Sequence, residues 1–456
     1  MQKYQTFTFV GYACLPEEGK IELEYSLKDP EDGSQPIDFK ETLTFNPILD
    51  WDQSRDVELD RALFMLHMIG GISYYKTCMP ETIEVGSGKL TPGEAEFWKT
   101  VYENGLGEFF YRNNIDFRGK INFPALAKES DRKPFIPPEH GFTTDERCLV
   151  PIGGGKDSLV TIKMLRKQKI PVTALRIGGH PLITAQAVAA GLPLLEVKRA
   201  LSPHLFELNE QGALNGHVPI TAYLNMLAIV LAILRGDTAV VFSNERSANE
   251  GNVEYLGMQI NHQWSKSLEF EKMLQEQVSA FSELNVFSLL RSLSELRITQ
   301  LYSQFTAYLP ITTSCNANWK IFAKSKIPKG AKPWCGECPK CAFVFVMLAA
   351  FLPVAEVTEV FGKNLLADET LLPLFKELLG IEGFKPFECV GTPEETKAAF
   401  LMIHDRGDSE DTPVMKMFAK DVLPGINNPK QLVESALLPS GEHAIPDRFQ
   451  NIVASF

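Results

Sequence analysis

The chain has 456 residues and a formal net charge of −12 at pH 7, from 45 Lys and Arg against 57 Asp and Glu. This length is enough for two or three domains, and the charged, apolar and aromatic fractions are those of an ordinary soluble globular protein. The negative net charge argues against a general nucleic-acid binder, because such a protein needs a positive field to gather phosphates. An anionic small-molecule substrate is compatible with the composition if its positive contacts are local.

The beginning of the chain and its apolar runs indicate neither export nor membrane insertion. The first residues, MQKYQ, lack the basic and apolar segments of a signal peptide. The longest apolar runs, near residues 222–234 and 341–355, are shorter than the roughly 18 residues that span a bilayer. We therefore expect a cytoplasmic protein without membrane contact, in which both runs form buried core helices.

Residues 1–140 predict a small α+β domain. Polarity alternates with a period of two over much of residues 1–50, which indicates antiparallel strands with one solvated face. A helical pattern follows at residues 57–69. Residues 91–94 (TPGE) predict a capping box with proline at the first helical position, and the helix should continue to about Asn113. Residues 134–138 (PFIPP) suit a linker to the next domain.

From Cys148 onward, apolar strands alternate with helices. The expected strands are 148–152, 171–177, 194–197 and 238–243, and the expected helices are 158–168, 185–190 and 219–235. This alternation implies right-handed crossovers and a parallel, doubly wound sheet, so we assign residues 141–310 to an α/β domain. Residues 311–456 form a third region, which is mainly helical beyond about residue 342.

A glycine-rich turn, Gly153-Gly154-Gly155-Lys156-Asp157-Ser158, follows the first of these strands. Glycines let the backbone approach a phosphate, and the helix N-terminus offers unpaired N–H groups, so the turn predicts an anion site. The Walker A pattern fails because Val150 and Asp157 stand where it needs glycine and Ser or Thr. The dinucleotide fingerprint fails because Ser158 stands where its third glycine belongs. The alternative is a tight turn without a ligand.

The turn resembles the Ser-Gly-Gly-x-Asp-Ser loop of the PP-loop ATP pyrophosphatases, with Gly153 in place of the first serine. That resemblance implies an enzyme whose substrate attacks the α-phosphorus of ATP and releases pyrophosphate. It also implies that Asp157 helps to hold Mg²⁺, that Ser158 and backbone amides bind pyrophosphate, and that Lys156 adds charge. Ligands of doubly wound sheets bind at the carboxyl ends of strands. The expected nucleotide-binding residues are Gly153, Gly154, Gly155, Lys156, Asp157, Ser158, Arg176, Gly178, Asn244 and Glu245.

Four of the eight cysteines cluster late in the chain. Cys335, Cys338 and Cys341 form a C-x2-C-x2-C motif, and Cys315 can supply a fourth ligand. Four thiolates make a closed tetrahedral site typical of structural zinc, and an iron–sulfur cluster or free thiols are the alternatives. The other cysteines are scattered, and we interpret them as ordinary thiols: Cys14, Cys78, Cys148 and Cys389.

Three polar segments, residues 215–217, 244–249 and 261–267, follow or flank the expected strands. Taken singly, His217 could be no more than a helix cap, and His262 could be an ordinary buried histidine. Together the segments indicate a polar pocket, in which histidine is the default acid–base residue near neutral pH.

Aromatic and basic residues are mixed at residues 72–76, 104–113 and 118–120. An amphipathic helix that packs its aromatic side chains would explain this composition. The functional interpretation is that the first domain supplies positive charge for an anionic substrate. The candidate substrate-binding residues are Tyr75, Lys76, Arg112, Arg118 and Lys120.

Taken in order, the motifs between about residues 55 and 350 resemble the bacterial UDP-N-acetylmuramoyl-L-alanyl-L-glutamate epimerase family, MurL. The matching segments are 66–76 (LHMIGGISYYK), 104–109 (NGLGEF), 118–121 (RGKI), the glycine turn, 215–219 (NGHVP), 261–267 (NHQWSKS) and 334–343 (WCGECPKCAF). This family converts the terminal L-Glu of UDP-MurNAc-L-Ala-L-Glu to D-Glu for peptidoglycan synthesis. It uses ATP and Mg²⁺ and releases AMP and pyrophosphate.

The resemblance implies that the α-carboxylate of the glutamate is adenylated before its α-proton is removed. The α-hydrogen of a free carboxylate is very weakly acidic, because its carbanion would carry a second negative charge. Transfer of AMP neutralises the first charge, and we hypothesise that closure to an oxazolone then assists racemisation. His217 or His262 is the expected acid–base residue, with Tyr255 and Lys266 as further candidates.

Two other functions stay open on the sequence alone. A PP-loop ligase, or an amidating or thiolating enzyme of the deazaguanine or tRNA-modifying kind, would share the AMP product and the zinc. It would need ammonia, a sulfur donor or RNA, and the acidic composition weighs against RNA. A nucleotide-binding regulator would not turn ATP over. The sequence does not indicate an oligomeric state.

Overall fold

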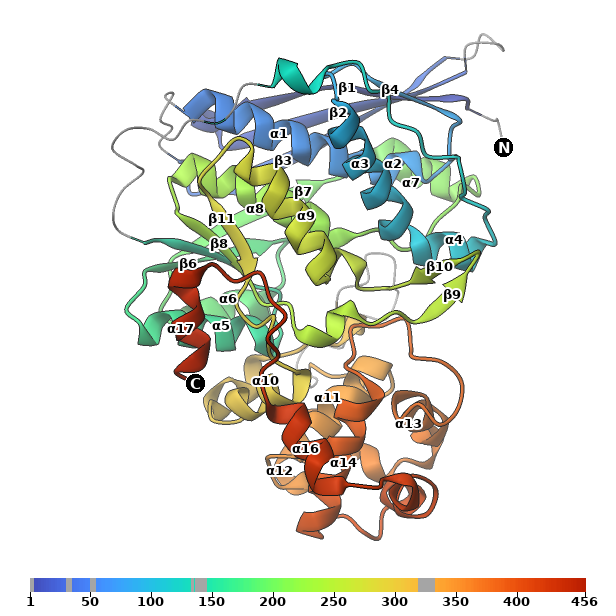
Figure 1. The fold of residues 1–456 in the computed structure, drawn as a ribbon, viewed down its shortest axis with the longest axis vertical. Helices are drawn as coiled ribbons and strands as arrows, with labels where there is room; N and C mark the ends of the chain where they lie inside the picture. The colour runs from blue at the N-terminus through green and yellow to red at the C-terminus, as the bar shows by residue number, and fades with distance from the viewer. Residues whose placement is uncertain (1–3, 30–34, 50–54, 133–134, 136–145, 319–332) are drawn as a thin grey trace.

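One large mixed sheet organises the chain (Figure 1). The computed structural model describes residues 4–29, 35–49, 55–132, 135, 146–318 and 333–456. Its strand order is β11-β8-β5-β6-β7-β3-β2-β1-β4. The strands are β1 (Thr6–Leu15), β2 (Lys20–Lys28), β3 (Ile37–Asn46), β4 (Thr82–Val85), β5 (Cys148–Pro151), β6 (Val172–Ile177), β7 (Leu194–Ala200), β8 (Ala239–Phe242) and β11 (Asn285–Ser288).

The five strands from β11 to β7 are all parallel, which confirms the parallel sheet predicted from the sequence. From β5 the chain moves one way to β6 and β7, and it later moves the other way to β8 and β11. The switch point of the sheet therefore lies between β5 and β8, where open α/β sheets bind their ligands. The glycine turn leaves β5 at this point. The four-residue strand β11 was not predicted.

Helices cover both faces of the parallel half, as a doubly wound sheet requires. Leu149 and Val240 point to the face where α8 (Ile220–Arg235) packs. Val150 and Val241 belong to the core on the other face, with α5 (Lys156–Lys167). Successive strand residues alternate between two cores because strand side chains have a period of two.

The two long apolar runs form α8 and α11 (Pro339–Ala349), and both helices are buried as predicted. Within the described part of the chain, no helix is at once long and apolar enough to cross a membrane.

The N-terminal strands form antiparallel ladders, as predicted, but they extend the same sheet. β3 pairs antiparallel with β7, from Thr42 opposite Ala200 to Asn46 opposite Glu196. β7 would otherwise be an edge strand with unpaired backbone groups, and β3 covers it. The sheet is thus continuous across residue 140, and the domain limits at residues 140 and 310 stay predictions. Apart from Phe135, the predicted linker lies outside the described residues.

The two helices predicted in the N-terminal region are present, but the second is divided into α3 (Pro92–Gly105) and α4 (Gly107–Asn113), and the short helix α2 (Ile72–Tyr75) was not predicted. The first is α1 (Asp56–Gly70). The capping box is present: the Thr91 hydroxyl accepts from the Glu94 N–H, and the Glu94 carboxylate accepts from the Thr91 N–H. The predicted single helix is interrupted at Leu106. A Cβ at Gly105 would lie 2.7 Å from Pro219, so glycine lets the end of α3 approach the start of α8.

A buried ionic network joins the antiparallel and parallel halves of the sheet. The Glu41 carboxylate on β3 accepts two hydrogen bonds from Arg199 on β7, at 2.8 and 3.0 Å. The hydroxyls of Tyr74 and Tyr223 donate to the same carboxylate at 3.0 and 2.6 Å. The Arg199 guanidinium also lies 3.8 Å from the centre of the Tyr223 ring. Glu41 is fully buried, so these donors are its only compensation for lost hydration among the described residues.

We expect Glu41→Ala to reduce the free energy of unfolding by about 3–5 kcal/mol, because Arg199 stays buried without a counter-charge. The matched control is Glu434→Ala, which removes an ion pair with Lys430 whose side chains are 60% and 86% exposed. An exposed pair should cost less than about 1 kcal/mol. Chemical denaturation monitored by circular dichroism measures both changes, and equal losses would contradict this account of the network.

The C-terminal region is helical where it is described, as predicted, and it forms a lobe beside the sheet (Figure 1). The last helix, α17 (Asp447–Ala454), leaves the lobe and returns to the sheet. The Phe449 ring lies 4.7 Å from that of Phe287 on β11, and Arg297 donates to the Phe456 carbonyl at 2.6 Å. The other helices are α6 (Pro181–Ala189), α7 (Pro203–Glu210), α9 (Leu268–Ser279), α10 (Glu295–Tyr302), α12 (Val354–Phe361), α13 (Leu372–Leu378), α14 (Pro393–Arg406), α15 (Pro413–Met417) and α16 (Pro429–Leu437).

Candidate active site

The glycine turn between β5 and α5 has the backbone of an anion site. Gly154 has φ +85°, in the left-handed region that favours glycine, and Gly155 is the extended residue before the first turn of α5. A Cβ at Gly153 would meet nothing within 4 Å, so the space beside the turn is open. The turn and the N-terminus of α5 therefore fit a phosphate group.

The carbonyl of Gly154 is held on the protein side of the turn. It accepts hydrogen bonds from the Gln186 side chain at 2.7 Å and from the Thr313 N–H at 2.8 Å. These bonds draw carbonyl oxygen away from the open side, where it would repel an anion. Ser158 lies buried in the first turn of α5.

Lys156 does not extend into the open space beside the turn. Its ammonium donates to Asp157 Oδ1 at 2.5 Å and to the buried carboxylate of Glu295. Lys340 Nζ lies 3.6 Å from the other oxygen of Glu295. Burial disfavours the charge of Lys156, but Asp157 and Glu295 raise its pKa well above the ordinary value. Lys156 therefore positions Asp157, and its contact with a phosphate stays a prediction.

The other candidate nucleotide-binding residues lie at the ends of β6 and β8. Arg176 is held by Glu196 at 2.8 Å and is buried, while Gly178 turns the chain after β6 with φ +79°. Asn244 lines a small cavity behind β8, and the Glu245 side chain is buried. These four residues lie at the carboxyl ends of the strands, as predicted. Their contacts with a nucleotide stay predictions.

Two predicted acid–base residues, His217 and His262, meet at Glu108, and we call these three residues the Glu108 cluster. Glu108 lies in α4, His217 lies before α8, and His262 follows the hairpin of β9 (Val253–Tyr255) and β10 (Met258–Ile260). The Nδ1 atom of His262 lies 2.5 Å from Glu108 Oε2, and that of His217 lies 3.5 Å from the same oxygen. The two imidazole centroids are 4.5 Å apart. Glu108 lies inside the NGLGEF segment and was not predicted as a site residue.

The two histidines of the Glu108 cluster have different charges near neutral pH. Burial lowers the pKa of His217 to about 3, and the charge of His262 acts in the same direction. Burial also disfavours the imidazolium of His262, but hydrogen bonds with Cys389 and Glu108 raise its pKa to about 9. A neutral ring that can accept a proton therefore lies beside a protonated ring that can donate one, as in acid–base active sites.

The Glu108 cluster also has the spacing of a metal site, since one ligand atom from each residue lies within 4.8 Å of the others. A metal ion would have to displace the proton of His262, whose pKa is raised, against the effect of burial, by Cys389 and Glu108. Arg112 brings a further positive charge, because its Nε donates to Glu108 Oε1 at 2.5 Å. We therefore interpret the cluster as an acid–base group.

Lys266 and Cys389 continue the site beyond His262. Lys266 Nζ donates to the Cys389 sulfur at 3.2 Å. Burial disfavours the Cys389 thiolate, but the charge of Lys266 and the hydrogen bond with His262 lower the pKa of the thiol to about 6. The interpretation of Cys389 as an ordinary thiol therefore does not hold. No motif marks this cysteine in the sequence, and only the fold brings it to the site.

Two basic residues of the first region lie next to the Glu108 cluster. Arg112 contacts Glu108, and its guanidinium lies 4.9 Å from the centre of the Phe387 ring. Lys76 donates to the Asn215 side chain at 2.9 Å, and burial lowers the pKa of this lysine to about 8. Both residues can therefore place positive charge beside the two histidines.

The remaining candidates lie farther from the cluster. Tyr75 is fully buried against Phe7 and Tyr102 in the aromatic core. Arg118 and Lys120 are exposed, with Arg118 paired to Asp116 at 2.7 Å. The Tyr255 hydroxyl donates to the Ile115 carbonyl at 3.3 Å. The substrate contacts of Tyr75, Arg118 and Lys120, and a catalytic role for Tyr255, stay predictions.

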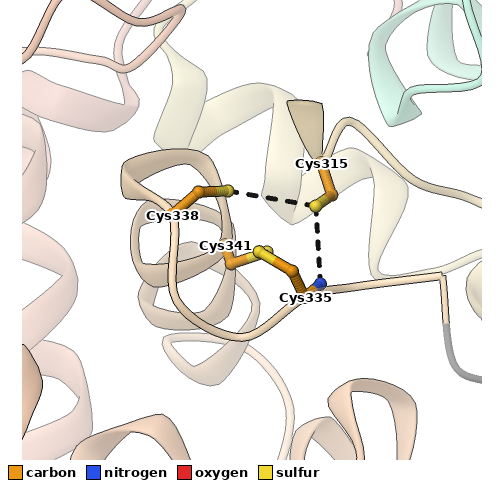
Figure 2. Close-up of side chains that lie close together, drawn as sticks. All are labelled: Cys315, Cys335, Cys338 and Cys341. Atoms are coloured by element: carbon orange, nitrogen blue, oxygen red, sulfur yellow. Dashed lines mark hydrogen bonds between the residues drawn. The ribbon is translucent and has the colours of Figure 1, made fainter. Parts of the chain in front are cut away.

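The four late cysteines converge from two segments of the chain (Figure 2). Their sulfurs lie within 4.8 Å of one another, with Cys315 to Cys338 at 3.9 Å and Cys335 to Cys341 at 3.7 Å. Tetrahedral zinc with Zn–S bonds of about 2.3 Å would separate its sulfurs by about 3.8 Å. The spacing fits one zinc ion, and the site is closed by four protein ligands.

Lys340 connects the cysteine site to the active site. It stands between Cys338 and Cys341 in the sequence. Its ammonium donates to the carbonyl of Cys389 and lies 3.6 Å from Glu295. A metal ion in the cysteine site would thus fix the segment that aligns both Cys389 and Glu295.

We expect about one zinc ion per chain, and its loss in Cys338→Ser should lower stability by several kcal/mol, because metal binding contributes directly to folding. Inductively coupled plasma mass spectrometry counts the zinc, and thermal unfolding measures the loss. Cys14→Ser, at a half-buried thiol of β1, is the control and should keep the metal. Purified wild-type chain with iron and sulfide in place of zinc would contradict the assignment.

Known proteins resemble this chain over nearly its whole length. Residues 1–289 match the profile of the MurL N-terminal domain, and residues 311–432 match that of the MurL C-terminal domain. Three similar proteins are each named UDP-N-acetyl-alpha-D-muramoyl-L-alanyl-L-glutamate epimerase. The one from Xanthomonas oryzae pv. oryzae is 40% identical over 390 residues, covering 85% of this chain and 84% of the relative.

Two further relatives cover the chain completely. The protein from Salinispora tropica is 37% identical over 460 residues and that from a Micromonospora species is 36% identical over 458, covering 97% and 99% of those relatives. The matched regions include the glycine turn, the Glu108 cluster and the four cysteines.

Proposed function

The chain belongs to the MurL family of epimerases, and from this premise we propose that it converts the terminal L-glutamate of UDP-N-acetylmuramoyl-L-alanyl-L-glutamate to D-glutamate. Its product is a precursor of peptidoglycan, so the enzyme acts in cell-wall synthesis. The observation that carries the acid–base part of the proposal is the Glu108 cluster, where a neutral and a protonated imidazole share one carboxylate.

ATP makes the α-hydrogen of the glutamate removable. The α-carboxylate attacks the α-phosphorus of ATP, and pyrophosphate leaves from the glycine turn. Asp157 would hold Mg²⁺, which neutralises charge on the pyrophosphate while the turn and the N-terminus of α5 bind its oxygens. Lys156 keeps Asp157 in place through the hydrogen bond at 2.5 Å. Once the carboxylate carries AMP, its negative charge no longer opposes formation of a carbanion at the α-carbon.

His217 removes the α-proton, because it is neutral and lies next to the Glu108 carboxylate that stabilises its imidazolium form. His262 supplies a proton, because its pKa is raised by Cys389 and Glu108 although burial opposes this. Proton transfer by positioned side chains of this kind raises a rate by roughly 10²–10⁴-fold. Water finally releases the free carboxylate and regenerates the enzyme.

The substrate carries several negative charges, and the acidic chain must offer local positive ones. Arg112 and Lys76 lie beside the Glu108 cluster and suit the carboxylates of the glutamate. Arg118 and Lys120, which are exposed, suit the phosphates of the uridine diphosphate. The zinc in the cysteine site is structural, and the cytoplasm, which supplies both ATP and the nucleotide-linked substrate, is the proposed place of action.

The test is an incubation of the full chain with UDP-MurNAc-L-Ala-L-Glu, ATP and Mg²⁺, followed by chiral analysis of the glutamate and by nucleotide chromatography. D-glutamate should appear together with AMP and pyrophosphate. UDP-MurNAc-L-Ala, which lacks the glutamate, is the control and should give no AMP. Formation of ADP, or AMP formation that does not depend on the dipeptide, would refute the proposal.

A further inference from the structure

Cys389 is held in a fixed place at the active site. The segment that carries it is anchored by Asn252, whose side chain donates to the Pro386 carbonyl at 2.8 Å. Lys340 donates to the carbonyl of Cys389 itself. The sulfur then meets Lys266 Nζ at 3.2 Å. The thiol is thus positioned by its backbone and by a cation.

The groups around Cys389 are arranged like those around an activated nucleophile. Glu108 orients His262 through the hydrogen bond of 2.5 Å at Nδ1, which leaves Nε2 as the ring's other hydrogen-bonding atom. His262 in turn interacts with Cys389, and against the effect of burial this interaction raises the pKa of the imidazole and lowers that of the thiol. A nucleophile, a base within hydrogen-bond reach and a third group that orients the base are the signature of covalent catalysis.

A short chain of contacts joins Cys389 to the glycine turn. Lys340 contacts the carbonyl of Cys389 and lies 3.6 Å from Glu295, and Glu295 accepts from Lys156 at the start of α5. Lys266 also interacts electrostatically with Asp157 across the same space. The thiol is therefore connected to the start of α5, beside the glycine turn, through two lysines and one carboxylate.

We propose that Cys389 is a catalytic nucleophile that takes the glutamyl group from AMP and holds it as a thioester while the α-proton is exchanged. This inference rests on the proposed function, since it needs the acyl-adenylate as its substrate. Lys266 and His262 keep the sulfur anionic, as their effect on the pKa of the thiol indicates.

The reaction balances without any further reagent. The thiolate of Cys389 attacks the acyl carbon, a C–S bond forms, and the C–O bond to AMP breaks with its electron pair on the AMP oxygen. His217 takes the α-proton of the thioester, and the protonated His262 returns one to the α-carbon. Water then attacks the thioester carbonyl, the thiolate leaves, and the free D-glutamyl carboxylate is released.

A thioester keeps the α-hydrogen activated after AMP has left. Sulfur donates electrons to a neighbouring carbonyl only weakly, so the α-hydrogen of a thioester is more acidic than that of an oxygen ester. The departure of AMP also frees space around the carbonyl while the acyl group stays activated. The alternative is that Cys389 only exchanges a proton with the α-carbon, and the experiment separates the two roles.

The experiment begins with the wild-type chain, UDP-MurNAc-L-Ala-L-Glu, ATP and Mg²⁺ in a single-turnover reaction stopped in acid. Peptide mass spectrometry should find the substrate acyl group on the peptide that contains Cys389, and hydroxylamine should remove it. Cys389→Ala should keep the dipeptide-dependent exchange of pyrophosphate into ATP, but D-glutamate formation should fall by at least about 10³-fold. Cys14→Ala, at a thiol of β1 outside the site, should behave as the wild type.

The possible results are distinct. Absence of the adduct from the wild-type chain overturns the nucleophile assignment, even where Cys389→Ala is inactive. Loss of pyrophosphate exchange in a normally folded Cys389→Ala overturns it too, since Cys389 would then act in adenylation. If Cys389→Ala keeps more than about a tenth of the wild-type rate of D-glutamate formation, the nucleophile assignment is also wrong. Failure of the wild-type chain to exchange pyrophosphate or form D-glutamate would instead refute the proposed function.

Discussion

Asp157→Asn is expected to reduce dipeptide-dependent pyrophosphate release by at least about 10³-fold, because a carboxylate that holds Mg²⁺ at the leaving group is replaced by a neutral amide. The Asp157 side chain is 28% exposed, so one side of it can reach a ligand in the turn while Lys156 holds the other. Asparagine keeps the size of aspartate, and Lys156 keeps its second partner, Glu295. The fold should therefore survive the change.

The control for this variant is Asp447→Asn, at the first position of α17, which is also an acidic residue in the first turn of a helix. It should release pyrophosphate at the wild-type rate, because α17 packs on β11, where its Phe449 contacts Phe287, and not on the glycine turn. Pyrophosphate is measured by a coupled colour assay, and the melting temperature reports the fold. If Asp157→Asn keeps more than about a tenth of the wild-type rate, Asp157 does not hold the metal ion.

His217→Ala should keep dipeptide-dependent pyrophosphate exchange but lose entry of solvent deuterium at the glutamate α-carbon by about 10²–10⁴-fold. The reason is that adenylation needs the glycine turn and not the histidine, whereas α-proton removal needs a neutral base beside Glu108. His204→Ala is the matched control, because His204 is a half-exposed histidine on α7. Mass spectrometry of the recovered glutamate measures the deuterium. Full exchange in both His217→Ala and His262→Ala would show that the acid–base assignment is wrong.

The second histidine of the Glu108 cluster, His262, should set the alkaline limit of the reaction. His262 donates only while protonated, and its pKa is raised to about 9 by Cys389 and Glu108 against the effect of burial. Activity should therefore fall above about that pH. In Glu108→Gln one of the two groups that raise this pKa is gone, so the fall should move to lower pH. An unchanged alkaline limb would show that another group supplies the proton.

The parallel half of the fold could be predicted from the sequence because its signals are local. Each strand except β11 is a short apolar run beside a helical segment, and the glycine turn and the C-x2-C-x2-C motif each lie within seven residues. The continuity of the sheet could not be predicted, because β3 and β7 pair across about 150 residues of sequence. An alternating strand pattern shows that a strand exists but not which edge it joins.

The candidate site was found only in part for the same reason. His217 and His262 could be selected because polar residues after strands gather at one sheet edge. Glu108 and Cys389 come from other segments, 109 residues before His217 and 127 after His262. Glu108 lies inside the NGLGEF segment, but nothing there marks it as a partner of the histidines, and no motif surrounds Cys389. Lys156 was expected to add charge at the phosphates, and the sequence did not indicate that its ammonium also bonds Glu295, which lies 139 residues away. Side-chain direction depends on such distant partners.

If ATP cleavage serves to exchange one C–H bond, a reaction in heavy water should leave its mark on that bond. The full chain is incubated with UDP-MurNAc-L-Ala-L-Glu, ATP and Mg²⁺ in deuterium oxide, and the glutamate product and AMP are counted. The account predicts D-glutamate with one α-deuterium and at least one AMP for each inverted centre. D-glutamate without deuterium, or inversion without AMP, would contradict it.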